Sequence, residues 1–132
     1  MATNGLVTIQ SRHGVKETID RLEAEAKAKG MTIFARVDHA AGATAAGMAL
    51  RPTELVVFGN AKAGTPLMQA SQAIGIDLPL KALAWEDDAG KVWLTYNDPA
   101  WLAARHGIDR ATANVTAAMG AALASLAQHA AA

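Results

Sequence analysis

The stretch ELVVFGNAKAGTPLMQ, residues 54–69, decides the fold because it joins a buried strand to a helix through small residues. The apolar run 55–58 is typical of a strand. Small residues follow from Gly59 to Gly64, and Thr65-Pro66 is predicted to open a helix, since threonine caps helices and proline favours their first position. Binding chemistry often lies where a strand end meets a helix start. This loop is therefore the first place to look for a site.

The spacing of Gly59 and Gly64 matches the glycines of a phosphate-binding loop. That motif requires a lysine directly after the second glycine, and Thr65 stands there instead, so hydrolysis of a nucleotide at such a loop is not predicted. Two interpretations stay open. Backbone N–H groups at the helix start, helped by Lys62, would favour an anion; a tight strand-to-helix turn explains the glycines more simply.

The remaining elements follow from periodicity and from helix-ending glycines. An alternating strand is predicted over 6–10, and an amphipathic helix that ends at Gly30 follows it. A strand that begins at Met31 and ends at Asp38-His39 leads to a short helix over 40–47. A hairpin of strands and two helices complete the chain. We expect one α+β domain over residues 1–132, with a mixed sheet of about five strands in the order β-α-β-α-β-α-β-β-α-α.

The hairpin is predicted from two apolar strands, 81–86 and 91–96, around the turn 87–90. A four-residue loop would pair Trp85 with Val92 and Leu83 with Leu94 on the core face. Trp93 would then point away from the core, where a tryptophan often marks an interface.

The last two helices are predicted from their caps. Asp98-Pro99 is a strong start for the first of them, and Asp109 is the expected cap of the second. The last helix carries small residues that allow close contact between helices: Ala118, Ala121, Ala122 and Ala124. Together with Trp93 they predict a homodimer.

Composition excludes several classes of function. The 132 residues carry no formal net charge, and no basic cluster is visible, so nucleic-acid binding is not predicted. Cysteine is absent, which excludes thiolate catalysis and cysteine-bound zinc. No apolar run approaches the roughly 18 residues of a membrane span, and the first ten residues lack a signal-peptide pattern. We expect a cytoplasmic protein with no membrane contact.

A few polar residues are candidates for chemistry. His39 ends the second strand and is a candidate acid or base, although a lone histidine more often serves packing or hydrogen bonding. Adjacent strand residues point to opposite faces, so Asp38 and His39 do not chelate one metal and no metal site is predicted. Tyr96 and Asn97 end the hairpin and are candidates to orient a substrate, with a core-edge tyrosine and a capping turn as the simpler explanation.

Two long stretches carry a family resemblance: RVDHAAGATAAGMALRPTELVVFGNAKAGTPLMQ (36–69) and GIDLPLKALAWEDDAGKVWLTYNDPAWLAARHGI (75–108). With the first helix, they resemble the domain-of-unknown-function family 302, although proline is usual in that family where Ala61 stands. The resemblance implies an α+β fold that tends to dimerise, with no established reaction or ligand. Its motifs correspond to His39, Asn60, Lys62, Gly64, Thr65, Leu78, Pro79, Tyr96 and Asn97.

Three hypotheses about function result. The first is a small non-enzymatic domain that binds a small molecule or anion near Gly59–Thr65, using residues drawn from Asn60, Lys62, Gly64, Thr65, His39 and Asn97. The second is an enzyme with His39 as acid or base, assisted by Tyr96. The third is a dimerisation or interaction module that uses Trp93 and the last helix. The sequence identifies no cofactor.

Overall fold

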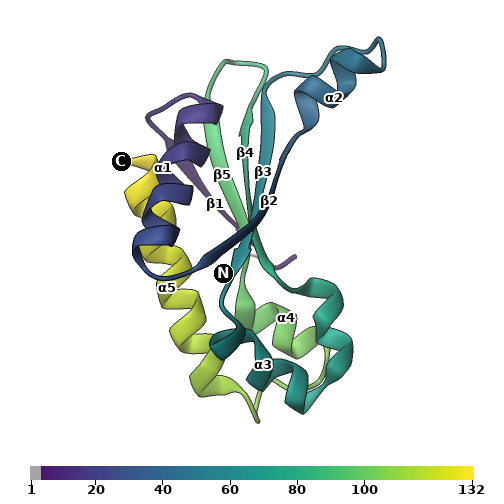
Figure 1. Ribbon diagram of the computed structural model, residues 1–132, viewed down its shortest axis with the longest axis vertical. Helices are drawn as coiled ribbons and strands as arrows, with labels where there is room; N and C mark the ends of the chain where they lie inside the picture. The colour runs from purple at the N-terminus through teal and green to yellow at the C-terminus, as the bar shows by residue number, and fades with distance from the viewer. Residues whose placement is uncertain (1–3) are drawn as a thin grey trace.

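The computed structural model describes residues 4–132, which form a five-stranded sheet with two long helices packed on one of its faces (Figure 1). The strands are β1 (Leu6–Ser11), β2 (Thr32–Asp38), β3 (Thr53–Gly59), β4 (Leu80–Glu86) and β5 (Val92–Asn97). The helices are α1 (Val15–Ala28), α2 (His39–Ala45), α3 (Ala61–Ala70), α4 (Pro99–Arg105) and α5 (Ala113–Ala131), with a 3-10 helix, η1 (Gln72–Asp77), after α3. The predicted α+β class and order of elements are confirmed.

The sheet is antiparallel throughout rather than mixed. Its strand order is β1-β5-β4-β3-β2, and each neighbouring pair is antiparallel. A β-α-β segment such as β1-α1-β2 usually joins parallel strands, and β1 and β2 would make the sheet mixed if they were neighbours. Here β1 and β2 run in the same direction but at opposite edges, because α1 crosses the whole sheet between them.

The core lies between the sheet and the apolar sides of α1 and α5. The fully buried side chains Ile19 and Leu22 of α1 face β3 and β4, whose inward residues include Val56 and Ala84. The predicted apolar stripe of α1 is therefore confirmed as its packing face. Alanines on β4 leave room for α1 to lie close to the sheet, and close packing of this kind stabilises the fold.

The register of the β4–β5 hairpin differs from the predicted one by a single residue. Trp85 lies opposite Trp93, and Leu83 lies opposite Thr95. The cause is Asp87, which closes the ladder by donating its backbone N–H to the Lys91 carbonyl at 2.8 Å. Its carboxylate also accepts the N–H groups of Ala89 and Lys91 at 2.9 Å each, so the loop has three residues instead of four.

This register gives the sheet an apolar outer face, opposite the face that carries α1 and α5. Trp93 points away from the core as predicted, but Trp85 and Leu83 point the same way, contrary to the prediction. The two indole rings lie 6.4 Å apart between centroids. The outer face continues across β3 and β2, and its large apolar side chains are Val37, Leu55, Val57, Leu83, Trp85 and Trp93.

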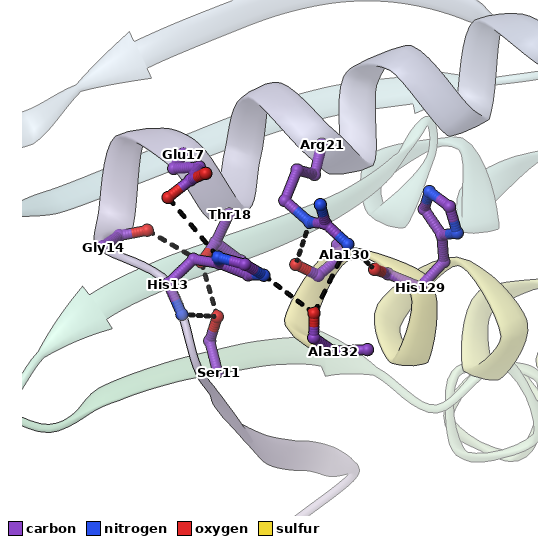
Figure 2. Close-up of polar contacts among 9 residues, drawn as sticks. All are labelled: Ser11, His13, Gly14, Glu17, Thr18, Arg21, His129, Ala130 and Ala132. Carbon is purple, nitrogen blue, oxygen red and sulfur yellow. Dashed lines mark hydrogen bonds and ion pairs between the residues drawn. The ribbon is translucent and has the colours of Figure 1, made fainter.

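The carboxyl end of α5 is held by residues of the β1–α1 segment (Figure 2). Arg21 donates from Nε to the Ala130 carbonyl at 3.1 Å and from Nη2 to the His129 carbonyl at 2.9 Å. His13 Nε2 lies 2.8 Å from the Ala132 carbonyl oxygen. The last carbonyls of a helix have no hydrogen-bond partners inside it and form the negative end of its dipole. A cationic side chain there donates the missing hydrogen bonds and interacts favourably with the dipole.

The other end of α5 corrects a prediction. The helix begins at Ala113 after Thr112, whose side chain makes no cap hydrogen bond, and Asp109 precedes both. The Asp98-Pro99 start of α4 is confirmed, since the Asp98 side chain accepts the Ala100 N–H at 3.0 Å.

Replacing Arg21 with alanine is expected to lower the free energy of unfolding by about 1 to 2 kcal/mol, because the carbonyls at the end of α5 lose a charged donor. Urea denaturation measures the change. Arg12→Ala is the matched control: it removes the same charge nearby, while the hydrogen bond of Arg12 to α5, among residues 4–132, is donated by its backbone N–H to the Ala131 carbonyl. Equal effects of the two substitutions would contradict the role given to Arg21.

Candidate functional site

The junction between β3 and α3 is a capped helix start, and the helix begins five residues earlier than predicted. Asn60 is the cap: its side-chain oxygen accepts the Lys62 N–H at 2.8 Å. Asparagine is a stronger cap than threonine, which explains why the helix begins after Asn60 and not after Thr65. Gly64, Thr65 and Pro66 consequently lie inside α3, and Pro66 is accommodated within the helix.

This geometry removes most of the expected donors for an anion. The N–H groups of Ala63 and Gly64 both bond to the Asn60 carbonyl at 3.0 Å, in addition to the bond from Lys62 to the Asn60 side chain. The Lys62 side chain is exposed. The first turn of α3 therefore satisfies three of its own N–H groups and leaves fewer for a ligand.

Beside this junction lies a cavity of about 730 Å³, which we call the α3–α5 cavity. It is bounded by α3, by η1 and the chain after it, by the amino-terminal half of α5, and by residues at the edge formed by β2. Most of its walls are apolar. The lining residues are Met31, Phe34, Gly59, Asn60, Ala61, Ala63, Gly64, Thr65, Met68, Gly75, Leu78, Pro79, Leu80, Asn114, Val115, Ala118, Met119 and Ala122.

A β-bulge supplies one aromatic wall of the cavity. The β2–β3 register shifts between Ile33 and Ala35, so Phe34 falls out of the regular alternation. Its ring lies against the backbone of Gly59, where a Cβ atom would come 3.7 Å from Phe34 Cε2. Phe34 remains 56% exposed, which places it at the mouth of the cavity.

The position of Gly75 keeps η1 close to α3. A Cβ atom added there would come 3.4 Å from the Met68 Sδ atom, at the limit of ordinary contact. On the other side of η1, Asp77 accepts hydrogen bonds from Arg105 Nη1 at 3.0 Å and contacts His106 Nε2 at 2.6 Å. This group ties η1 to α4 and so fixes one wall of the cavity.

The structure brings together part of the predicted site. Asn60, Gly64 and Thr65 line the α3–α5 cavity, as do Leu78 and Pro79 from the family motif. Sequence reasoning missed the remaining walls. Three of the five methionines of the chain line the cavity, namely Met31, Met68 and Met119. They come from three different segments, so no spacing in the sequence could have grouped them.

His39 does not lie near this corner. It opens α2 directly after Asp38, which pairs with Glu54 at the first half of β3, whereas Gly59 ends that strand. Gly59 lies five residue steps after Glu54, about 17 Å along the strand at the usual rise. Figure 1 shows α2 and α3 at opposite ends of the sheet. An acid–base site that combines His39 with the β3–α3 junction is therefore not assembled.

Tyr96 and Asn97 lie on β5, two strands away from β3, and neither lines the α3–α5 cavity. Tyr96 is buried on the inner face, where it pairs with Ala82 and Val7, and Asn97 pairs with Leu6. Burial raises the pKa of the Tyr96 hydroxyl above its ordinary value, and the negative charge of Asp98 raises it further. Tyr96 thus behaves as a core residue with a protonated hydroxyl.

Residues 4–132 contain neither a cluster of metal ligands nor a helix that could span a membrane. Within that range no group of three or more His, Asp or Glu side chains is placed to hold a metal ion. Over the same residues, no helix combines the length and apolar character that crossing a bilayer requires.

The raised pKa of Tyr96 predicts that stability falls as the pH rises above about 10, because the unfolded chain ionises first. Tyr96 is the only tyrosine, so absorbance near 295 nm follows it alone. We expect a higher titration midpoint in the folded protein than in urea. Asp98→Asn, which keeps a good helix cap, should lower that midpoint. Identical midpoints for folded and unfolded protein would refute this assignment.

Comparison with known proteins places the chain in a family. Residues 7–126 match DUF302, a domain of unknown function. A crystal structure of an uncharacterized conserved DUF302 protein from Bacillus stearothermophilus has a TM-score of 0.86, with 98% of this chain and 99% of the other covered. The identity is 20%, so this similarity concerns the fold alone.

Curated relatives of higher identity are longer proteins. Proteins named "Fluoride-specific ion channel FluC 1" from Brucella suis and Brucella abortus are 63% identical over 105 residues. The match covers 80% of this chain and 41% and 39% of those relatives. The chain thus matches about two-fifths of the length of each of them. Because the family match extends over most of its length, the chain belongs to the DUF302 family.

Proposed function

We propose that this domain binds a small molecule in the α3–α5 cavity and carries out no reaction on it. The observation that carries the proposal is the cavity itself. Its volume of about 730 Å³ lies within the range of roughly 300 to 1,000 Å³ that is usual for small-molecule sites. Apolar walls with a few polar groups at the mouth are also usual for such sites.

An anion as the ligand has less support than an apolar molecule. The hypothesis depended on unpaired N–H groups at the start of α3, and those of Lys62, Ala63 and Gly64 are already bonded to Asn60. An enzyme that uses His39 has less support still, because a general acid or base must lie within hydrogen-bond reach of the reacting group. His39 lies about 17 Å along the sheet from the junction, by the rise of β3.

The longer relatives suggest a setting for such a domain. In the Brucella proteins named fluoride-specific ion channels, the matched segment is 41% or less of the whole. We propose that the DUF302 domain acts there as a ligand-binding module attached to a transport protein, with conduction assigned to the rest of the chain. A cytoplasmic location for the present protein stays a prediction from its sequence.

We also propose that the protein is a homodimer, with the outer face of the sheet as its interface. Trp93 and α5 lie on opposite sides of the sheet, so one contact cannot use both. The outer face offers several large apolar side chains, since Leu55, Leu83, Trp85 and Trp93 share that face on the adjacent strands β3, β4 and β5. Apolar patches of this extent on soluble domains usually mark an interface.

The cavity proposal predicts saturable binding of Nile red, an uncharged dye that fluoresces in apolar sites. Ala118 is an exposed α5 residue that lines the cavity, and Ala118→Trp should fill it and weaken binding at least tenfold. Ala121→Trp is the matched control, because Ala121 is exposed on the same helix but does not line the cavity. Sodium fluoride at millimolar concentration should not displace the dye. Equal binding by both variants would place the site elsewhere.

The dimer proposal predicts a mass of two chains by sedimentation at micromolar concentration. Leu83→Glu should give a monomer, since a charge on the outer face would lose its water on association. Ala121→Glu, on the exposed side of α5, should leave the dimer intact. Circular dichroism checks that both variants fold. A monomeric parent protein would contradict the proposal outright.

A further inference from the structure

The walls of the α3–α5 cavity carry no charged side chain among the residues that the structure describes. Every lining residue is apolar, a glycine, or one of three neutral polar residues: Asn60, Thr65 and Asn114. A charged group that enters such a site loses its water and gains no opposite charge, which is costly. The cavity therefore selects against ions of either sign, whatever their shape.

The neutral polar groups are all at exposed parts of the lining. Asn60, Thr65 and Asn114 are all exposed, and they belong to the β3–α3 junction, α3 and α5. The Asn60 side-chain oxygen is occupied by the Lys62 N–H, so its amide NH₂ group is the part that can donate to a ligand. Within residues 4–132, no hydrogen bond involves the side chains of Thr65 or Asn114. These groups can hold one polar end of a molecule at the mouth.

The deeper walls suit a flexible or irregular apolar body. Met31, Met68 and Met119 contribute unbranched thioether chains that adapt to different shapes. Gly64 adds no side chain to the wall formed by α3, and a Cβ atom there would come into ordinary contact with Leu78 Cδ1, at 3.7 Å. Adaptable walls of this kind favour chain-like ligands over rigid polar ones.

We infer that the ligand is an uncharged amphiphile: an apolar body held by the methionines, with one neutral hydrogen-bonding end at Asn60 and Asn114. This inference rests on the proposed function and names the chemical class of its ligand. A fluoride ion does not belong to that class, since the cavity offers it no cation. A carboxylate and an ammonium of the same apolar length are excluded for the same reason.

Three probes of equal length separate charge from shape: octan-1-ol, octanoate and octylammonium at pH 7. Each is titrated into the protein while amide shifts are followed by NMR, with Gly75 and Ala118 as reporters inside the cavity. We expect the alcohol to shift both reporters and to bind at least tenfold more tightly than either ion. Either ion binding as tightly as the alcohol would overturn the inference while leaving a small-molecule site in place. No shift with any of the three would overturn the proposed function as well.

Two variants sharpen the test. Ala118→Lys places a cation at the lining and should raise the affinity for octanoate severalfold, whereas Ala121→Lys, outside the lining, should not. Asn114→Leu should weaken the alcohol about threefold to tenfold, the usual effect of one lost hydrogen bond. Unchanged octanoate binding in Ala118→Lys, with a folded spectrum, would count against the charge argument.

Discussion

The packing of α1 across the sheet is the constraint on which the rest of the structure depends. This helix carries the chain from β1 at one edge to β2 at the other, a span of four strand spacings or about 19 Å. Because β1 and β2 run in the same direction, α1 must return along the strands as it passes over the sheet, and its 14 residues give it a length of about 21 Å, close to the roughly 20 Å of the six-residue strand β1. Because the helix must cross one face of the sheet, that face becomes the core, and Ile19 and Leu22 are fully buried there. The opposite face is left without helices, which is why Trp85 and Trp93 pack against one another on it.

The α3–α5 cavity follows from a mismatch of lengths. The 19 residues of α5 extend about 28 Å, whereas strands of six or seven residues extend about 20 to 23 Å. Arg21 and His13 hold the carboxyl end of α5 beside the start of α1, so the excess length projects past the opposite end of the sheet (Figure 1). There α5 has no strand beneath it, and α3 and η1 face it across the open space. The contacts of Arg21 and His13 with the carboxyl end of α5 thus determine where the cavity forms at its amino-terminal end.

The sequence predicted the elements well because each carries its own local signal. The apolar stripe of α1, the glycine after it, and the Asp98-Pro99 start of α4 depend on neighbours only a few residues away. The wrong predictions have a different cause. Each depended on which of two candidate residues takes a structural role, or on residues far away in the sequence. Asparagine and threonine both favour the cap position, and only the structure shows that Asn60, not Thr65, caps α3. Asp87 joins the ladder instead of the loop and moves the hairpin register by one residue.

The site was predicted in part for the same reason. Asn60 and Thr65 adjoin a turn that is visible in the sequence, whereas Met31, Met68 and Met119 come together only after folding. His39 was misplaced because the antiparallel β2–β3 pair delivers it to the far end of the sheet.

The chemistry of the cavity also bears on the longer relatives. A small, strongly hydrated anion such as fluoride needs donors or a cation to replace its water, because stripping that water without compensation is costly. N–H groups at the start of α3 already donate hydrogen bonds to Asn60, and the residues that line the cavity carry no charge. If the domain in those relatives keeps these features, the ligand that we propose for its cavity is an uncharged molecule and not the ion. A ligand that touches α3, η1 and α5 together would stabilise their arrangement in proportion to its affinity. The carboxyl end of α5 is bound to the β1–α1 segment. A ligand in the cavity would therefore stabilise a helix that also forms part of the core.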